Sequence, residues 1–359
     1  MDIYVFDSSF EILRIVDVYA SLIWTQRYQE MGDFEIVVPA TTDMIELFRV
    51  GRFVGRACDV SQGVAGLIDA SDMMIVTGRE IKTDAEDGDN LIITGQDLKS
   101  ILKRRVISSQ TVLSGTVASC IETLLNDNII DAVDTDRNID GFAFGATTVG
   151  TNTMKRQFTG DNLLEAITDI CVENGLGFKV TLESSEFFTF MLYEGTDRSK
   201  PPFGLNPDTV IISPEFDNLL SSEYKEDTSN FANVAYVAGE GQGSARTIKE
   251  TSIGSPTGLD RFEIWCDARN ASSNEGEISE ADYLAQLATE GQEALADAVI
   301  VTDFEGEIVE NPNYPFNLGD IVTIITAQGI ERNVRVTEMI YSIDDEGLTI
   351  VPTFREENI

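Results

Sequence analysis

The sequence predicts an α+β protein that is mainly β and is divided into several domains. Three observations support this. The chain has 359 residues, which is more than a single domain usually holds. Short runs of alternating apolar and polar residues, bounded by turn residues, lie near both ends, whereas helical spacing of apolar residues is mostly confined to the middle. Many short strands at this spacing are typical of a barrel or sandwich.

Residues 1–95 are predicted to form a first β-barrel-like domain. Alternation marks residues 34–38 as a strand, and residues 44–48 are expected to form one or two helical turns. The runs before and after the acidic turn at 84–89 predict a hairpin. Further strands are expected at residues 3–6, 53–54 and 74–76.

Residues 96–200 are predicted to form a small α/β domain with two or three helices. A short helix is expected at 97–102, and Ser114 is expected to cap the next one. A third helix is predicted to start at Thr159 or Asp161 and to end at Gly175. A hairpin follows, with strands at 177–182 and 187–192.

Residues 201–298 are predicted to form a β-rich segment with one helix, and residues 299–359 to supply C-terminal strands that complete a second barrel-like part. Residues 247–264 are expected to form a strand pair around a turn. Ser279 and Asp282 have the spacing of a capping box and predict the start of the helix.

The charge of the chain is strongly negative. There are 62 acidic and 25 basic residues, which gives a net charge of −37. Such a surface repels the phosphates of nucleic acids. This acidity has two interpretations: it keeps the protein soluble, or it has a role in function.

The composition makes an enzyme less probable. The chain contains no histidine, so the commonest general base and the commonest metal ligand are missing. Enzymes that use two carboxylates need no histidine. Acidic pairs such as Asp169 with Glu173 and Glu223 with Glu226 therefore leave that class open.

No cofactor or metal is predicted. The glycine-rich run at 239–243 follows a strand, but the residues after it look extended and give no helix to bind phosphate. The acidic run at 84–89 lacks the register of a calcium loop. The four cysteines, Cys58, Cys120, Cys171 and Cys266, match no zinc or redox spacing, and no apolar run is long enough to cross a membrane.

Four segments together carry a resemblance to a known family. They are Trp24 to Pro39 (WTQRYQEMGDFEIVVP), residues 73–81, residues 93–105 and residues 233–246. In this order they resemble the hub-like tail proteins of siphophages and related prophages, which are related to baseplate hubs. The matches are spread over most of the chain and concern strands and turns, so the resemblance transfers no catalytic residue.

The resemblance implies a structural virion protein. Hubs of this kind are homotrimers in which each chain supplies two tube-like β-barrel domains, so that three chains imitate a six-fold ring. The implied role is to join the hexameric tail tube and the distal tail protein to a trimeric tip or fibre. The resemblance also implies a channel through which DNA passes and a final place at the tail tip. The net charge predicts that acidic side chains line this channel, and the absence of a disulfide framework fits synthesis in the bacterial cytoplasm.

Two other functions stay open. One is a carboxylate-dependent hydrolase that degrades the cell wall, and the other is a receptor-binding tip protein. The candidate site residues are Trp24, Arg27, Tyr28 and Phe34. They are interpreted either as packing residues, with Arg27 stacked on an aromatic ring, or as part of a subunit interface, where Trp, Tyr and Arg are enriched.

Overall fold

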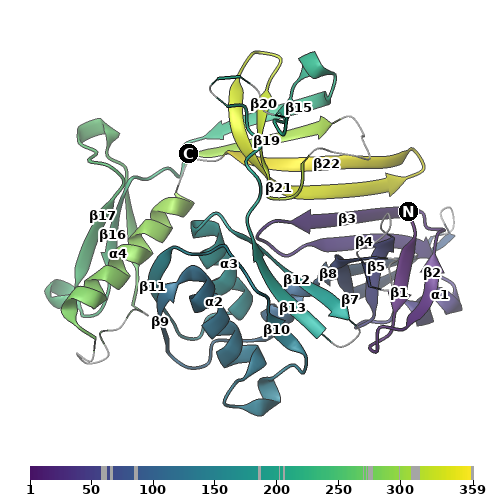
Figure 1. Cartoon of the computed structure of the whole chain (residues 1–359), viewed down its shortest axis with the longest axis horizontal. Helices are drawn as coiled ribbons and strands as arrows, with labels where there is room; N and C mark the ends of the chain where they lie inside the picture. Colours follow the sequence, from purple (N-terminus) through teal and green to yellow (C-terminus); the bar gives the residue numbers. More distant parts are fainter. Residues whose placement is uncertain are drawn as a thin grey trace.

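A computed structural model shows the architecture of the chain. It describes residues 1–57, 63–64, 68–84, 88–184, 187–201, 203–204, 207–269, 271, 273, 278–298, 300–308 and 316–356. The fold is α+β and mainly β, as predicted (Figure 1). Within the described residues, no helix is both long and apolar enough to cross a membrane.

The N-terminal β unit contains the strands that precede residue 98. Its core includes Trp24, Phe34, Ile36 and Ile93, all buried. The predicted hairpin is present in much longer form, because its first strand begins at Ile68; residues 85–87 of its turn lie outside the described residues. The elements are β1 (Ile3–Phe6), β2 (Ile12–Val16), β3 (Ser21–Arg27), β4 (Asp33–Pro39), α1 (Thr42–Leu47), β5 (Phe53–Ala57), β6 (Gly63–Val64), β7 (Ile68–Asp84) and β8 (Gly88–Asp97).

The α/β unit follows and has its own apolar core, in which Cys120 and Cys171 are buried. Two helix starts differ from the prediction. Ser114 pairs within a strand, and Thr116 caps the helix instead, because its hydroxyl accepts the Ser119 N–H at 3.2 Å. Asn162 caps the next helix, since Thr159 and Asp161 bond to each other in the preceding turn. The elements are η1 (Leu98–Arg104), β9 (Thr111–Thr116), α2 (Val117–Leu125), η2 (Asn126–Ile130), η3 (Thr135–Arg137), β10 (Phe142–Phe144), β11 (Thr153–Phe158), α3 (Leu163–Glu173), β12 (Gly177–Ser184) and β13 (Phe187–Tyr193).

The C-terminal β unit is formed by two separate parts of the sequence. Its core contains Val322, Val336 and Phe354, all buried. The last two strands form the predicted hairpin, with Asp344 paired to Gly347 at its turn. The elements are β14 (Ile211–Ile212), η4 (Pro214–Phe216), β15 (Leu219–Asp227), β19 (Val301–Ile308), β20 (Ile321–Ile325), β21 (Glu331–Asp344) and β22 (Gly347–Glu356).

The insert unit, residues 231–298, interrupts the C-terminal β unit between β15 and β19. The predicted strand pair in 247–264 is wrong, because the two strands do not pair with each other; both pair with a third strand that lies between them. The predicted helix start is confirmed, because the Ser279 hydroxyl accepts the Asp282 N–H at 3.2 Å. The elements are β16 (Val234–Ala238), η5 (Gly243–Ala245), β17 (Ile248–Ser252), η6 (Gly258–Asp260), β18 (Glu263–Asp267) and α4 (Glu280–Asp297).

One continuous sheet joins the two β units (Figure 1). Its strand order is β15-β19-β22-β21-β3-β4-β8-β7-β5-β1-β2, with β14 reached through β20 and with β6 on β7. The two units meet where β3 pairs antiparallel with β21, from Leu22 opposite Ile343 to Arg27 opposite Glu338. The strand pairing among the described residues follows an open path, so the two predicted barrels are not established as closed.

Candidate functional site

The segment from Trp24 to Pro39 forms the seam between the two β units. Its strand β3 pairs with β4 on one side and with β21 on the other. Trp24 therefore lies between Phe34 and Tyr341, and its ring stacks on that of Phe34 at 5.4 Å between centroids. Trp24, Tyr28 and Phe34 are all buried within the single chain.

A buried ionic network lies beside Trp24. The Asp72 carboxylate accepts the Trp24 indole N–H at 2.6 Å and the Gln26 amide at 2.8 Å, and it forms an ion pair with Arg56. The Arg56 guanidinium lies 4.0 Å from the centroid of the Tyr341 ring, on β21. One carboxylate thus holds together β3, β5 and β7, and Arg56 extends the contact to the C-terminal β unit.

Tyr28 lies where three units meet. Its backbone N–H donates to Thr337 O at 2.9 Å, and its hydroxyl donates to Gly175 O at 3.0 Å. The ring is packed so closely against Gly177 and Gly319 that a side chain at either position would overlap it. Tyr28 therefore connects the N-terminal β unit with both the α/β unit and the C-terminal β unit.

Within the described part of the chain, Arg27 pairs with carboxylates and is not stacked on an aromatic ring, which differs from the expected stacking. It forms ion pairs with Asp33 and Glu338 and donates to Met31 O at 2.7 Å. Among the described residues, the cations that lie over the seam aromatics Trp24 and Tyr28 are Arg56 and Arg335. The Arg27 side chain keeps about a quarter of its surface exposed (25%), so it alone of the four candidate residues retains appreciable surface that a neighbouring subunit could contact.

Lys99 fixes the turn that follows β3. Its ammonium group donates to the carbonyls of Arg27 and Glu30 at 2.7 and 2.6 Å and lies 4.9 Å from the Phe178 ring centroid. Burial lowers the pKa of Lys99, and the neighbouring Asp97 opposes this shift. Asp97 itself accepts the N–H of Gly32 at 2.8 Å, so both side chains are engaged in holding this turn.

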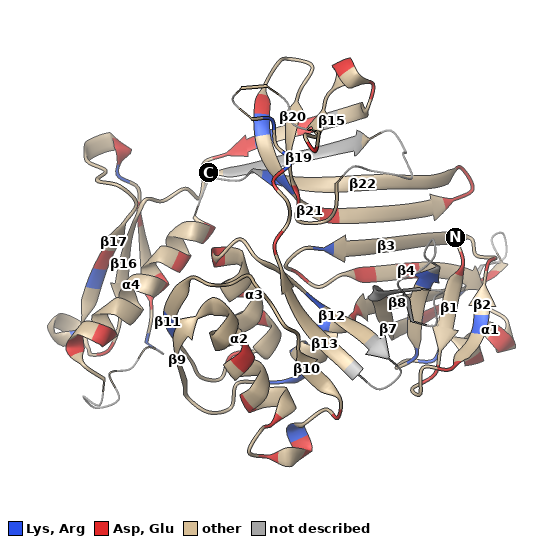
Figure 2. Cartoon of the chain, in the orientation of Figure 1, with Lys and Arg blue, Asp and Glu red and all other residues tan. Residues whose placement is uncertain are grey.

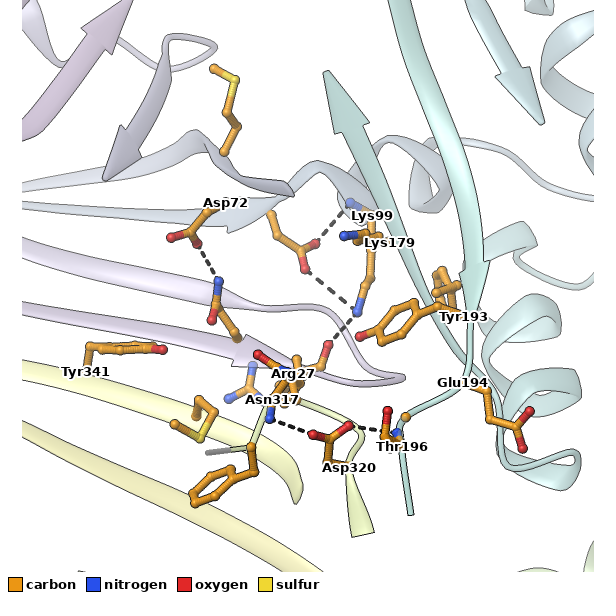
Figure 3. A pocket seen from close by; sticks show the side chains of 18 of the residues that line it. Arg27, Asp72, Lys99, Lys179, Tyr193, Glu194, Thr196, Asn317, Asp320 and Tyr341 are labelled. Carbon is orange, nitrogen blue, oxygen red and sulfur yellow. Dashed lines mark hydrogen bonds and ion pairs between the residues drawn. The ribbon is translucent and has the colours of Figure 1, made fainter. Parts of the chain in front are cut away.

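A cavity of about 600 Å³ lies between the three units (Figure 3). Three of the carboxylates that line it already have partners within the chain: Asp72 and Asp97, as above, and Asp320. The Asp320 carboxylate accepts the N–H groups of Thr196 and Asn317 at 2.7 and 2.9 Å and forms an ion pair with Arg198 at 2.6 Å. These bonds attach the linker that follows β13 to the C-terminal β unit. In the described part of the chain, no group of three or more His, Cys, Asp or Glu side chains is placed to hold a metal ion.

Most of the side chains that build this junction could not be found from the sequence. Arg56, Asp72 and Asp320 lie in three separate segments, and none belongs to a recognisable motif. Lys99 lies in segment 93–105, which carries part of the family resemblance, but nothing in that segment marks its side chain as buried. Of the carboxylate pairs considered, Asp169 and Glu173 both contact Arg156, while Glu223 and Glu226 lie on β15. Cys58 lies outside the described residues.

The model of one protein family matches the chain almost from end to end. That family is the Siphovirus ReqiPepy6 Gp37-like protein family, and the match covers residues 2–354. The chain belongs to this family. The resemblance to siphophage tail proteins that the four segments carry is therefore confirmed.

Solved structures share the fold of this Gp37-like protein at low sequence identity. The tail protein from Neisseria meningitidis MC58 has a TM-score of 0.60 and 14% identity, covering 100% of this chain and 97% of that one. The prophage MuSo2 43 kDa tail protein from Shewanella oneidensis has a TM-score of 0.57 and 11% identity, with coverages of 99% and 98%. The prophage tail protein gp18 from Listeria monocytogenes EGD-e has a TM-score of 0.55 and 14% identity, with coverages of 99% and 95%. No curated protein matches the Gp37-like chain in sequence.

Proposed function

We propose that the protein is a structural hub of the siphophage tail tip. In this role it is a homotrimer in the virion that joins the hexameric tail tube and the distal tail protein to a trimeric tip or fibre. The observation that carries the proposal is the pairing of two β units in one sheet through β3 and β21. Three such chains around one axis would present six β units, which matches the symmetry of a six-fold tube.

The ends of the sheet support contacts between subunits. The pairing path ends at β2 on one side, and β2 exposes Ile12, Leu13 and Ile15 to 42%, 43% and 46%. An exposed apolar edge strand favours pairing with another chain. In the hub, we expect β2 to be covered by a neighbouring subunit.

The net charge supports a channel for DNA. Acidic residues occur on all four units (Figure 2), and three chains of −37 each carry 3 × −37 = −111. Carboxylates that face the lumen would keep DNA phosphates from adhering during ejection. A trimer whose lumen proved neutral or basic would contradict this part of the proposal.

The trimer can be tested by the mass of the purified protein in solution. Light scattering at high protein concentration should give three times the 39.5 kDa of one chain. Ile15→Lys should lower the association constant of the trimer at least about tenfold, because it places a charge on the exposed edge strand β2. Val133→Lys makes the same change at a side chain that is fully exposed in the α/β unit and should leave the mass unchanged. Equal effects of the two substitutions on the mass would show that β2 is not part of the trimer interface.

A hub of this kind should not degrade the cell wall. We expect no clearing when the purified protein is renatured in a peptidoglycan gel, because Asp169 and Glu173 are already paired with Arg156. Clearing that is lost in Asp169→Asn would instead support a carboxylate-dependent hydrolase. Saturable adsorption of the purified chain to host cells would favour a receptor-binding protein.

A further inference from the structure

The insert unit is attached to the C-terminal β unit at one end only. The chain leaves after β15 and returns at β19, and these strands are antiparallel neighbours with Asp227 opposite Val301. The two crossings are held together by the Ala232 N–H, which donates to Ala298 O at 2.8 Å. The unit therefore stands to one side of the molecule (Figure 1), where the face of α4 approaches β11 of the α/β unit.

Arg156 on β11 connects these two units. Its side chain is 9% exposed, and its guanidinium lies 2.6 Å from Glu293 on α4 and 2.9 Å from Glu173 on α3. Asp169 on α3 lies farther away, at 3.8 Å, and the Phe158 ring centroid is 4.7 Å from the guanidinium carbon. One buried cation is thus shared by carboxylates from both units.

Carboxylates outnumber cations around Arg156. The charged groups that face this region come from β11, α3 with the turn before it, and α4: Lys155, Arg156, Asp161, Glu165, Asp169, Glu173, Asp282, Glu290, Glu293 and Asp297. Lys155 pairs with Asp282 at 2.7 Å, so a second, more exposed ion pair also joins β11 to α4. One buried oxygen, Glu293 Oε1, has no hydrogen-bond donor among the described residues, although the Glu173 carboxyl lies against Glu293. A proton shared between these two carboxyls would provide the missing donor.

The burial of the pair favours keeping that proton. Burial raises the pKa of Glu293 to about 9, with Glu173 and Glu290 adding to the shift and Arg156 opposing it. Burial likewise raises the pKa of Glu173. Solvent reaches the pair through a cavity of about 600 Å³ between the units, which Lys155, Glu173 and Glu293 help to line.

We propose that Arg156, Glu173 and Glu293 form a proton-controlled latch that holds the insert unit against the α/β unit. With a proton on the carboxyl pair, one ion pair with Arg156 and one carboxyl–carboxyl hydrogen bond close the interface. Loss of this proton places a second negative charge in a buried site that holds one guanidinium, and the insert unit then swings away about its two crossings. The latch does not depend on the role of the protein as a hub.

The direction of the pH effect follows from proton binding. In the open state Glu293 is hydrated and returns toward its ordinary pKa of 4.5, whereas in the closed state its pKa is about 9. The closed state therefore binds one more proton between these two values. The proton-linked contribution to the closing equilibrium is fully present below pH 4.5. As the pH rises, the equilibrium constant for closing falls by up to about tenfold per pH unit, and the contribution is lost above about pH 9.

Hydrogen exchange of the whole protein between pH 6 and pH 9 tests the latch. After correction for intrinsic exchange rates, the protection factors of amides in β11 and on the adjoining face of α4 should fall at least about tenfold from pH 6 to pH 9. Amides in the β7–β8 ladder, far from the latch, should keep theirs. Unchanged protection of β11 over this range would overturn the proposal.

Matched variants separate the latch from general loss of structure. Glu293→Gln removes the titrating group but keeps a side chain that can donate to Glu173, so protection of β11 should no longer change with pH. Glu173→Gln should give the same result if Glu293→Gln fails to fold. Glu280→Gln, in the exposed first turn of the same helix, should behave as the wild type. A wild-type pH response in both latch variants would show that the pair is not the switch.

Discussion

Gly195→Ala is expected to destabilise the protein by about 3 kcal/mol or more. A methyl group at this position would overlap the carbonyl of Gly319 and lie 2.6 Å from Asp320 N, both of which are backbone. The Gly319 backbone cannot move aside freely, because its N–H donates to Val336 O and its carbonyl accepts from Arg335, each at 2.8 Å. The substitution should therefore separate the linker after β13 from the C-terminal β unit.

Urea unfolding at a fixed protein concentration measures this effect. Gly329→Ala is the control, because a methyl group there meets nothing and only the positive φ of +81° opposes it. A left-handed conformation costs a residue with a side chain roughly 1–2 kcal/mol. If Gly195→Ala proved no more costly than Gly329→Ala, the close packing of the linker against Gly319 would not matter for stability.

Arg56→Met is expected to destabilise the protein by about 3–5 kcal/mol. The substitution keeps most of the apolar volume of the side chain but leaves the Asp72 carboxylate, 5% exposed, without its cation. Trp24 and Gln26 would still donate to Asp72, yet two neutral donors do not compensate a buried charge. Contact between Arg56 and the Tyr341 ring would be lost at the same time.

Arg49→Met is the matched control for this prediction. Arg49 pairs with Glu46 at the surface, where both side chains are more than half exposed. Exposed pairs contribute about 0–1 kcal/mol, so the free energy of unfolding should change little. Combining Arg56→Met with Asp72→Leu should restore much of the lost stability, since no unpaired charge would remain. No recovery in the double variant would mean that Arg56 acts through packing alone.

The sequence predicts local structure well where the signal is local. Hairpins such as β12–β13 and the start of α4 at Ser279 follow from alternation, turn residues and capping, which depend on neighbours in the chain. The family also followed from short segments, because Trp24 to Pro39 and its companions occur in a characteristic order. The helix starts at Thr116 and Asn162 were missed because several hydroxyl, amide and carboxyl side chains near each start compete for the same N–H groups.

The junction could not be predicted because its contacts are long-range. The partner of Trp24 is 48 residues away at Asp72, and the partner of Thr196 is 124 residues away at Asp320. The central position of β16 between β17 and β18 depends on a parallel pairing that no hairpin pattern encodes. An isolated arginine or aspartate gives no signal of burial until the strands that surround it are placed.

Electron microscopy of the purified protein, with two-dimensional class averages, tests the hub proposal most directly. The proposal predicts ring-shaped particles with three-fold symmetry, six β units around a central hole and acidic side chains lining that hole. Compact monomers at high concentration would call for a second preparation that contains the neighbouring tail proteins. Particles that stay monomeric and without a hole in that preparation would contradict the hub.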